Sequence, residues 1–243
     1  MKKILIVGGT HGDEKTGIEV VGMLDRIKEE SLLYEHITTL IANPKASKKN
    51  VRFVETNLNQ SFGVKDPQSY EEKRAVEIMP LLTGHDFILD FHNTTSRTTC
   101  AIVTETPTES QRAVIRCFGF DKVVIMPPGG SLSGQYPLKT VSFEISNSDR
   151  GYFSSTYFVE KITRMYELPT EKSSDVHFFR FEGKVSKDTF SKLEMNINDF
   201  KDFFPLTDNQ AEKLEVPRER IPIFIGEKAY KEDAFLLVKK EVL

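Results

Sequence analysis

The chain has 243 residues, of which 39% are hydrophobic and 28% charged, and its formal net charge is −3. This composition is typical of a soluble globular protein and excludes a disordered chain, and the near balance of charges argues against a nucleic-acid-binding protein. No apolar run approaches the roughly 20 residues of a membrane span, and no signal peptide is evident. Cys100 and Cys117 are the only cysteines, so neither a disulfide framework nor a cysteine metal site is supported. We therefore expect a cytoplasmic protein without a nucleic-acid or membrane partner.

The N-terminal stretch combines an apolar run with a polar loop. Residues 4–7 are branched and apolar and are bounded by turn formers, which predicts a buried strand. A glycine-rich loop follows, and it carries His11 and Glu14 at H-x-x-E spacing. An amphipathic helix is predicted from about Thr16 to about Glu30. His11 and Glu14 therefore lie at the carboxyl end of a strand, where open α/β sheets bind ligands.

The next elements alternate between strands and helices. Strands are predicted over residues 37–42, 86–91, 100–104, 122–126 and 141–145, and helices over 69–82, 108–118 and 152–166. The polar segment 45–64 has weak periodicity, and we interpret it as a long loop that serves a site. This alternation predicts an α/β fold with a parallel or mixed sheet covered by helices on both faces.

The pattern changes at about Pro169. Short strands with a glycine turn are predicted over residues 176–185, and further strands over 221–225 and 234–238. We therefore expect a main α/β domain over residues 1–168 and a small β-rich domain over residues 169–243.

Two histidines and a glutamate are candidate metal ligands. His92 follows the predicted strand 86–91, so parallel packing would bring it beside His11 and Glu14. Two imidazoles and a carboxylate that leave one position for water are typical of catalytic zinc. Asp90 lies on the same strand face as His92 and would hold the second ring nitrogen of a ligand. Each histidine alone would be interpreted as a polar loop residue, but together they favour a metal centre.

Two further charged residues are candidates for the chemistry at such a centre. Glu144 lies within the apolar run 141–145, where burial would raise its pKa and suit a general base that takes a proton from zinc-bound water. Its alternative is a polar residue at an exposed strand end. Arg52 would polarise a carbonyl and stabilise the oxyanion that forms, and its alternative is a solvated loop arginine.

Two competing hypotheses belong to other functional classes. The segment from Gly9 to Thr16 matches a phosphate-binding loop, except that Glu14 replaces the second glycine. A carboxylate at that position would repel a phosphate, so a nucleotide-binding protein is disfavoured. A binding module without chemistry would use the polar loops for ligand contacts only.

Five segments in chain order resemble the succinylglutamate desuccinylase/aspartoacylase family of zinc-dependent amide hydrolases, which is related in fold to the zinc carboxypeptidases. The segments are Gly9-Thr10-His11-Gly12-Asp13-Glu14; Asn43-Pro44 with Ala46, Arg52 and Asn57-Leu58-Asn59-Gln60; Asp90 to Ser96; Phe143-Glu144-Ile145; and Pro222 to Tyr230. The resemblance implies a carboxypeptidase-like catalytic domain and a β-rich C-terminal domain that contributes to the substrate pocket.

The resemblance also implies an activity and a set of roles. One zinc per chain would be held by His11, Glu14 and His92, and Glu144 would activate water. The residues that it implies at the substrate are Arg52, Asn59, Gln60, Asn93 and Tyr230. The implied partner is a small N-acyl amino acid or N-acyl amine, which a deacylase cleaves at its amide bond, and a homo-oligomer is left open. The alternative is a degenerate family member that binds metal or ligand without hydrolysis.

Two departures from the family concern the substrate. Relatives that act on acylated aspartate or glutamate carry an Arg at the position of Gln60, and a second Arg before the catalytic Glu. Residues 130–136 correspond to that second position and contain no Arg. Bidentate pairing with Arg is the strong way to hold a carboxylate, so we expect a substrate that is not a dicarboxylate.

Overall fold

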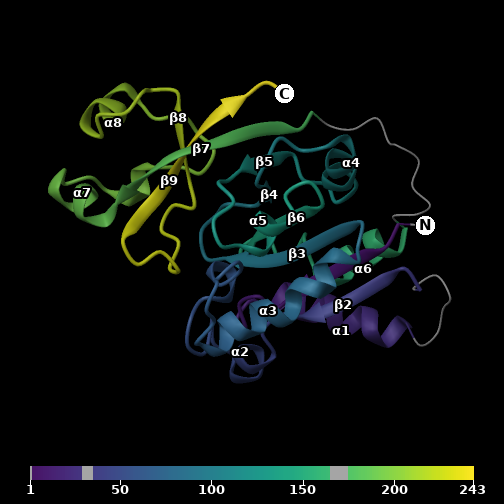
Figure 1. Cartoon of the computed structure of the whole chain (residues 1–243). Coiled ribbons are helices and arrows are strands. Elements are labelled where there is room, and N and C mark those ends of the chain that lie inside the picture. The colour runs from purple at the N-terminus through teal and green to yellow at the C-terminus, as the bar shows by residue number, and fades with distance from the viewer. Residues whose placement is uncertain (1, 29–34, 165–174) are drawn as a thin grey trace.

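The computed structural model describes residues 2–28, 35–164 and 175–243, which build one sheet of nine strands (Figure 1). The strands are β1 (Ile4–Gly8), β2 (Ile37–Ile41), β3 (Phe87–Thr94), β4 (Cys100–Val103), β5 (Lys122–Ile125), β6 (Thr140–Ser146), β7 (His177–Ser186), β8 (Arg220–Ile223) and β9 (Asp233–Glu241). Their order across the sheet is β2-β1-β3-β6-β4-β5-β7-β9-β8. Pairing is parallel among β2, β1, β3 and β6, whereas β4 is antiparallel to β6 and β9 is antiparallel to both of its neighbours. The predicted mixed α/β sheet is therefore confirmed.

Helices cover both faces of the sheet. The helices are α1 (Lys15–Lys28), α2 (Pro44–Lys49), α3 (Tyr70–Thr83), α4 (Glu109–Cys117), α5 (Leu132–Gln135), α6 (Ser155–Arg164), α7 (Lys187–Lys192) and α8 (Asp208–Lys213), with 3-10 turns η2 (Leu58–Gln60) and η3 (Ile197–Asp199). The apolar sides of α1, α4 and α6 share one core cluster with the strands, and α3 packs with η2 in a second cluster.

The strand β1 shows why an unbroken apolar run forms the centre of the sheet. Ile4 and Ile6 enter the cluster with α1, α4 and α6, whereas Leu5 and Val7 enter the cluster with α3. Successive side chains of a strand point to opposite faces, so a strand covered on both faces needs apolar residues at every position.

The segment 45–64 is not a loop throughout, so that prediction was wrong. Asn43 and Pro44 were expected to end the second strand, but Pro44 opens α2, and the Asn43 side chain accepts a hydrogen bond from the amide of Ala46 at 3.1 Å. Asparagine at the N-cap and proline at the first helical position together favour a helix start. A helix of six residues is too short to show clear periodicity in the sequence.

The C-terminal part also differs from the prediction. The expected pair of short strands is one strand, β7, whose register against β9 shifts between Phe181 and Gly183. Gly183 therefore lies at a bulge and not in a turn. The short helices α7 and α8 were not predicted, and Figure 1 shows them beyond the end of the sheet that is farthest from α1 and β2.

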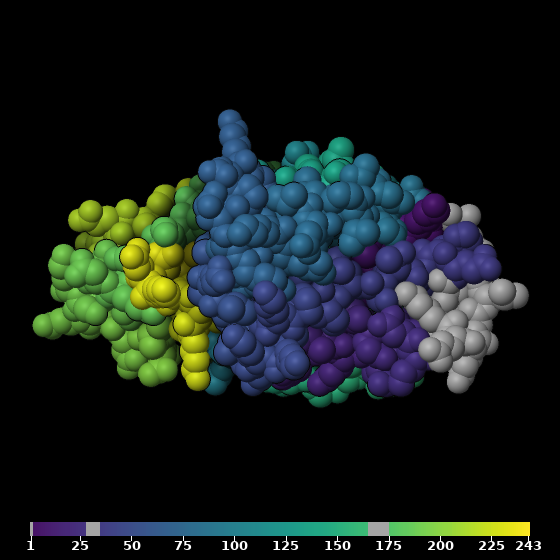
Figure 2. All heavy atoms as spheres, turned by 60° about the horizontal axis from the view of Figure 1, so that its bottom comes forward, coloured from purple at the N-terminus to yellow at the C-terminus, as the bar shows by residue number. Residues whose placement is uncertain are grey.

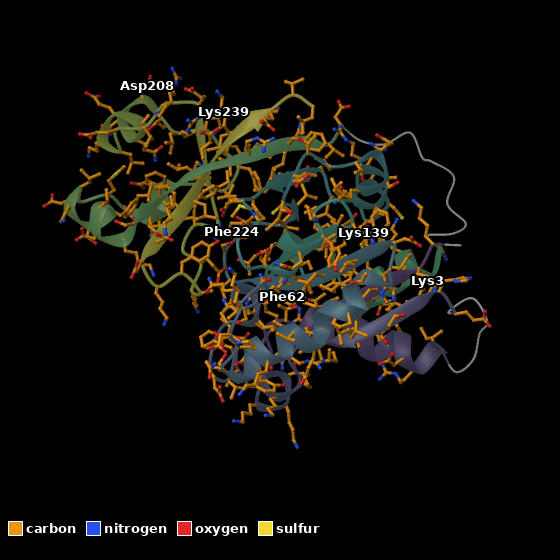
Figure 3. All side chains as sticks on the ribbon, viewed as in Figure 1. Lys3, Phe62, Lys139, Asp208, Phe224 and Lys239 are labelled. Carbon is orange, nitrogen blue, oxygen red and sulfur yellow. The ribbon has the colours of Figure 1, made fainter. Side chains whose placement is uncertain are left out.

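The strands β7, β9 and β8 continue the main sheet, and β7 and β9 also contribute to a separate apolar cluster around Phe190, Phe200 and Phe235. Figure 3 shows Phe224, which follows β8, where these strands meet the main part of the molecule. The expected boundary at residue 168, and the predicted ends at Glu30 and residue 166, lie outside the described residues. The division into two domains stays a prediction.

Three parallel strands end at the same edge and define the site. Phe87, Leu89 and Phe91 of β3 face the cluster that contains α6, so Asp90 and His92 project to the other face. His92 was expected to follow its strand, but β3 continues to Thr94 because its pairing with β6 continues that far. In that register His92 lies directly beside Glu144.

Candidate metal centre

Three buried side chains meet at the carboxyl ends of β1 and β3. The Nδ1 atom of His11 lies 2.7 Å from one carboxylate oxygen of Glu14, and the Nδ1 atom of His92 lies 2.9 Å from the other. Their candidate ligand atoms all lie within 4.8 Å of one another. Among the described residues, these three side chains form a cluster that could bind a metal ion. The structure therefore brings together the three residues that the sequence proposed as ligands.

The loop that carries His11 is held close to neighbouring backbone. A Cβ atom added at Gly12 would lie 2.1 Å from the carbonyl carbon of Ala46, so no other residue fits against the first turns of α2. The Gly12 amide donates to the carbonyl oxygen of Arg52 at 3.1 Å. Glycine at this position thus fixes the distance between the His11 loop and the segment that follows α2.

An oxygen acceptor orients each imidazole. The Nε2 atom of His92 lies 2.8 Å from Asp90 Oδ2, and Asp90 Oδ1 accepts a hydrogen bond from Thr10 Oγ1 at 3.0 Å. The Nε2 atom of His11 lies 3.0 Å from Asn57 Oδ1. This amide oxygen also accepts from the Asn59 backbone N–H at 3.0 Å, which fixes the orientation of the amide. Both Nε2 atoms therefore carry protons, and both Nδ1 atoms face Glu14.

This donor set fits zinc. Two Nδ1 atoms and a carboxylate, each histidine held through its other nitrogen, are the ligands and outer contacts of catalytic zinc centres. The charges of these groups also shift one another's pKa values. Burial raises the pKa of Glu14, but the two histidines outweigh it and hold that pKa well below its usual range. Burial lowers the pKa of His92, but Asp90 and Glu14 hold it well above its ordinary value. A divalent cation at this place would be bound by the same carboxylate and imidazoles.

Glu144 lies on β6 beside His92 and projects to the same face. Burial raises its pKa to about 8; the Glu14 and Glu227 charges add to this rise, while His92 and Arg52 oppose it. On its other side Glu144 is paired in register with Cys100 of β4, a buried free thiol. The carboxyl group thus has a proton affinity in the range that proton transfer near neutral pH requires.

Arg52 approaches the centre from the segment after α2. Its Nη1 donates to Glu14 Oε1 at 3.0 Å, and about a third of its side chain is exposed. The expected guanidinium is therefore beside the ligand group and partly open to solvent, instead of being a solvated loop arginine.

Asn93 binds protein groups at both ends of its amide. Its Oδ1 accepts from the Thr16 backbone N–H at 3.0 Å, and its Nδ2 donates to Thr16 Oγ1 at 2.9 Å. Its own backbone N–H donates to Glu14 at 3.1 Å. These contacts occupy the N-terminus of α1, where a phosphate loop would bind its anion.

Asn59 and Gln60 lie in η2, against the segment that follows β5. The Asn59 Oδ1 atom lies 3.4 Å from the Leu132 backbone N–H, and the backbone N–H of Phe62 donates to Gly130 at 3.0 Å. The Gln60 side chain is exposed. The two stretches in which the sequence lacks an Arg, Gln60 and residues 130–136, are thus neighbours in space.

Tyr230 lies in the loop between β8 and β9, which Figures 1 and 2 show beside the segment containing α2 and η2. Its ring packs edge-on against Phe224 with 6.2 Å between ring centroids. Burial raises the pKa of Tyr230, and the Glu144 and Glu227 charges raise it further, so the hydroxyl keeps its proton. The tyrosine can therefore donate a hydrogen bond.

Glu227 fastens this loop to the end of β3. One carboxylate oxygen accepts from the Thr94 hydroxyl and from the backbone N–H groups of Thr95 and Ser96 at 2.8 and 3.1 Å. The other accepts from the Ala229 backbone N–H at 2.9 Å. Sequence reasoning assigned no role to Glu227, nor to Thr10 or Asn57. All three residues lie in segments that resemble the family, and this resemblance was the signal that could have identified them.

Comparison with known proteins identifies the family to which the chain is similar. The model of the "Succinylglutamate desuccinylase/Aspartoacylase catalytic domain" family matches residues 1–132. The chain is 37% identical over 108 residues to a probable aspartoacylase of Acaryochloris marina, and this match covers 40% of this chain and 36% of that protein. It is 33% identical over 109 residues to an N-acyl-aromatic-L-amino acid amidohydrolase (carboxylate-forming) of Danio rerio, covering 38% of this chain and 33% of that protein. The matched segment thus spans about a third of each of these relatives.

The fold is shared over a longer stretch. The crystal structure of a succinylglutamate desuccinylase from Chromobacterium violaceum superposes with a TM-score of 0.77 at 21% sequence identity. That match covers 100% of this chain and 85% of the other. Within the ranges that the structure describes, no helix has both the length and the apolar content needed to cross a bilayer.

Proposed function

Because the chain belongs to the succinylglutamate desuccinylase/aspartoacylase family, we propose that it is a zinc-dependent hydrolase that cleaves the amide bond of a small N-acyl amino acid. The observation that supports this most is the convergence of His11, Glu14 and His92 beside Glu144. These four side chains place a cation site next to a proton acceptor, at the carboxyl ends of neighbouring strands.

Each ligand would donate one atom to the zinc: Nδ1 of His11, a carboxylate oxygen of Glu14 and Nδ1 of His92. When bound, the zinc supplies Lewis acidity, which polarises the substrate carbonyl and lowers the pKa of water. Asp90 and Asn57 keep the protons of the imidazoles on Nε2, so that both Nδ1 lone pairs point toward the same place.

Glu144 would move the proton. Its carboxylate takes a proton from the attacking water while the water oxygen forms a bond to the amide carbon. The same carboxyl group then donates the proton to the leaving nitrogen as the carbon–nitrogen bond breaks, which yields a carboxylic acid and an amine, and these ionise to carboxylate and ammonium. A pKa raised to about 8 by burial favours both uptake and release of the proton.

Arg52 and Tyr230 would act on the substrate oxygens. Arg52 carries a permanent positive charge beside Glu14, where negative charge develops on the carbonyl oxygen during attack. Tyr230 keeps its hydroxyl proton and can donate it in a hydrogen bond.

The acidic substrates of some relatives are disfavoured for this chain. The exposed Gln60 lies next to residues 130–132, and neither stretch supplies a guanidinium. A second substrate carboxylate would have no bidentate partner there. We therefore propose a substrate whose acyl group and side chain carry no second carboxylate.

Metal analysis and a substrate panel test this function. We expect about one zinc per purified chain and hydrolysis of neutral N-acyl amino acids, at least about tenfold faster than of N-acetylaspartate or N-succinylglutamate. Activity is expected to disappear with chelation and to return with zinc. Zinc binding without hydrolysis of any panel member would indicate the degenerate family member, and an active metal-free protein would overturn the proposal.

A further inference from the structure

The residues from Arg52 to Asn57 reach the centre at both ends. Arg52 donates to the ligand Glu14 at one end, and Asn57 holds the imidazole of the ligand His11 at the other. No regular helix or strand spans the residues between them, so no ladder of backbone hydrogen bonds fixes their positions. Another group must therefore set the course of this segment.

The carboxylate of Glu71 binds the middle of the segment. Its Oε1 accepts from the backbone N–H of Val54 at 2.6 Å, and its Oε2 accepts from the backbone N–H groups of Glu55 and Thr56 at 3.1 Å each. Three consecutive amides thus converge on one carboxylate, which is 0% exposed. Charge-assisted bonds of this kind are stronger than neutral ones and fix the donors in space.

A fourth bond ties the same carboxylate to the loop after β2. Asn43 donates from Nδ2 to Glu71 Oε1 at 3.0 Å, and its own Oδ1 caps α2, against which Gly12 packs. The four hydrogen bonds satisfy Glu71 completely, and none of them contacts the candidate metal ligands. Glu71 is therefore a buried charge that the proposed chemistry does not itself use.

We propose that Glu71 is a positioning residue for the metal centre, which holds Arg52 and Asn57 in place by binding the amides of the three residues between them. The inference rests on the proposed zinc hydrolase. It assigns to α3, which contributes no side chain to the centre, control over both the orientation of His11 and the placement of the guanidinium.

If Glu71 only stabilised the fold, its substitution would not change zinc affinity more than substitution of a similar capping residue. The neighbouring Glu72 provides this control. Glu72 also accepts from two backbone N–H groups, those of Gln68 and Ser69 at 2.8 Å each, but these belong to the cap of α3. Glu71→Gln and Glu72→Gln both place an amide N–H₂ among backbone donors. Only the first change acts on the backbone amides of the segment that reaches the centre, because the cap of α3 contacts that segment through the side chains of Glu55 and Thr56.

The test measures zinc affinity by competition with a chelator, together with kcat and KM. Glu71→Gln is expected to weaken zinc binding about tenfold and to lower kcat, whereas Glu72→Gln changes zinc affinity less than about twofold. In an Asn57→Ala background, Glu71→Gln is expected to cost less zinc affinity than it does in the wild type, because one of the two contacts through which it acts is already lost. Fully additive losses would overturn the proposal.

A second measurement uses the unaltered protein and does not depend on whether the variants fold. Amide hydrogen exchange at Val54, Glu55 and Thr56 is expected to be slow in the presence and absence of zinc. Exchange at the rate of an unprotected loop would show that Glu71 does not hold these three amides. If the chain binds no zinc but these amides are protected, the proposed hydrolase is refuted, while the hydrogen bonds to Glu71 are supported.

Discussion

The two sides of the candidate centre are built in different ways. On the strand side, Asp90, His92 and Glu144 project from β3 and β6, and the backbone ladder between these strands sets their separation. On the loop side, Arg52, Asn57 and Tyr230 lie outside regular strands and helices. Their segments are fastened by Glu71 and Glu227, each of which accepts several backbone N–H groups.

This difference shows what a loop needs in order to place a side chain accurately. A strand in the middle of a sheet has its amides satisfied by its neighbours, so alternate side chains are positioned without further help. A loop has unpaired amides, and buried amides must find partners. Here two carboxylates distant in sequence supply those partners, and in doing so they fix the loops that carry functional groups.

The largest effects are expected at one catalytic candidate on the strand side, Glu144, and one on the loop side, Arg52. Glu144→Gln is expected to lower kcat by about 10²–10⁴ because the proton acceptor is lost, while zinc stays bound. Arg52→Ala is expected to lower kcat by about 10²–10³ through loss of charge at the developing oxyanion. Steady-state kinetics with parallel zinc analysis checks both.

The exposed Glu160 on α6 offers a matched control for these variants. Glu160→Gln removes a carboxylate from the surface of the opposite face and is expected to leave kcat unchanged. If Glu144→Gln retained more than about a tenth of the activity, Glu144 would not be the general base.

An intermediate effect concerns the outer contacts of the two histidines. Asp90→Ala is expected to weaken zinc binding by about 10–100-fold, because His92 loses a carboxylate that both orients it and raises its basicity. Asn57→Ala removes only a neutral amide and is expected to cost less. Chelator competition measures both affinities.

Asn196 makes the control for this comparison. It caps η3 as Asn57 caps η2, with its side chain accepting from a backbone N–H at 3.0 Å, but within the described residues it makes no hydrogen bond to a histidine. Asn196→Ala is expected to leave zinc affinity unaltered. A larger loss in Asn57→Ala than in Asp90→Ala would reverse the assignment of the dominant outer contact.

The smallest expected effect is at the loop that carries Tyr230. Glu227→Gln weakens the hold on Thr95 and Ser96 and is expected to raise KM several-fold and to cost about 1–3 kcal/mol of stability. Glu232→Gln, an exposed change in the same loop, is the control. Equal KM values in the two variants would show that the position of Tyr230 does not depend on Glu227.

The pH dependence of this effect has a defined sign. Burial raises the pKa of Glu227, but hydrogen bonds from Thr94, Ala229 and Ser96 outweigh it and lower the pKa below 4.5. A carboxyl group with a lowered pKa stabilises the fold above its ordinary pKa and loses that contribution as the pH falls. The stability difference between the wild type and Glu227→Gln is therefore expected to shrink below pH 4.5 in acid-unfolding measurements.

Prediction from the sequence was most accurate for the central strands and the long helices. The apolar runs at residues 4–7 and 141–145 are visible in the sequence because strands covered on both faces need them. The short helices α2, α5, α7 and α8 were missed, because six residues or fewer do not establish a period and their starts depend on local caps.

The sequence by itself determined the types of residue at the centre, which are two histidines and two glutamates. It also placed them in or near predicted strands, because apolar runs mark those strands. Only the tertiary structure decided which oxygen orients which imidazole, and that Glu71 and Glu227 hold the loops. The physical reason is the range of the interactions. Strand and helix patterns arise between near neighbours in the chain, whereas Glu227 binds Ser96 across 131 positions, and only the folded sheet brings such groups within hydrogen-bonding distance.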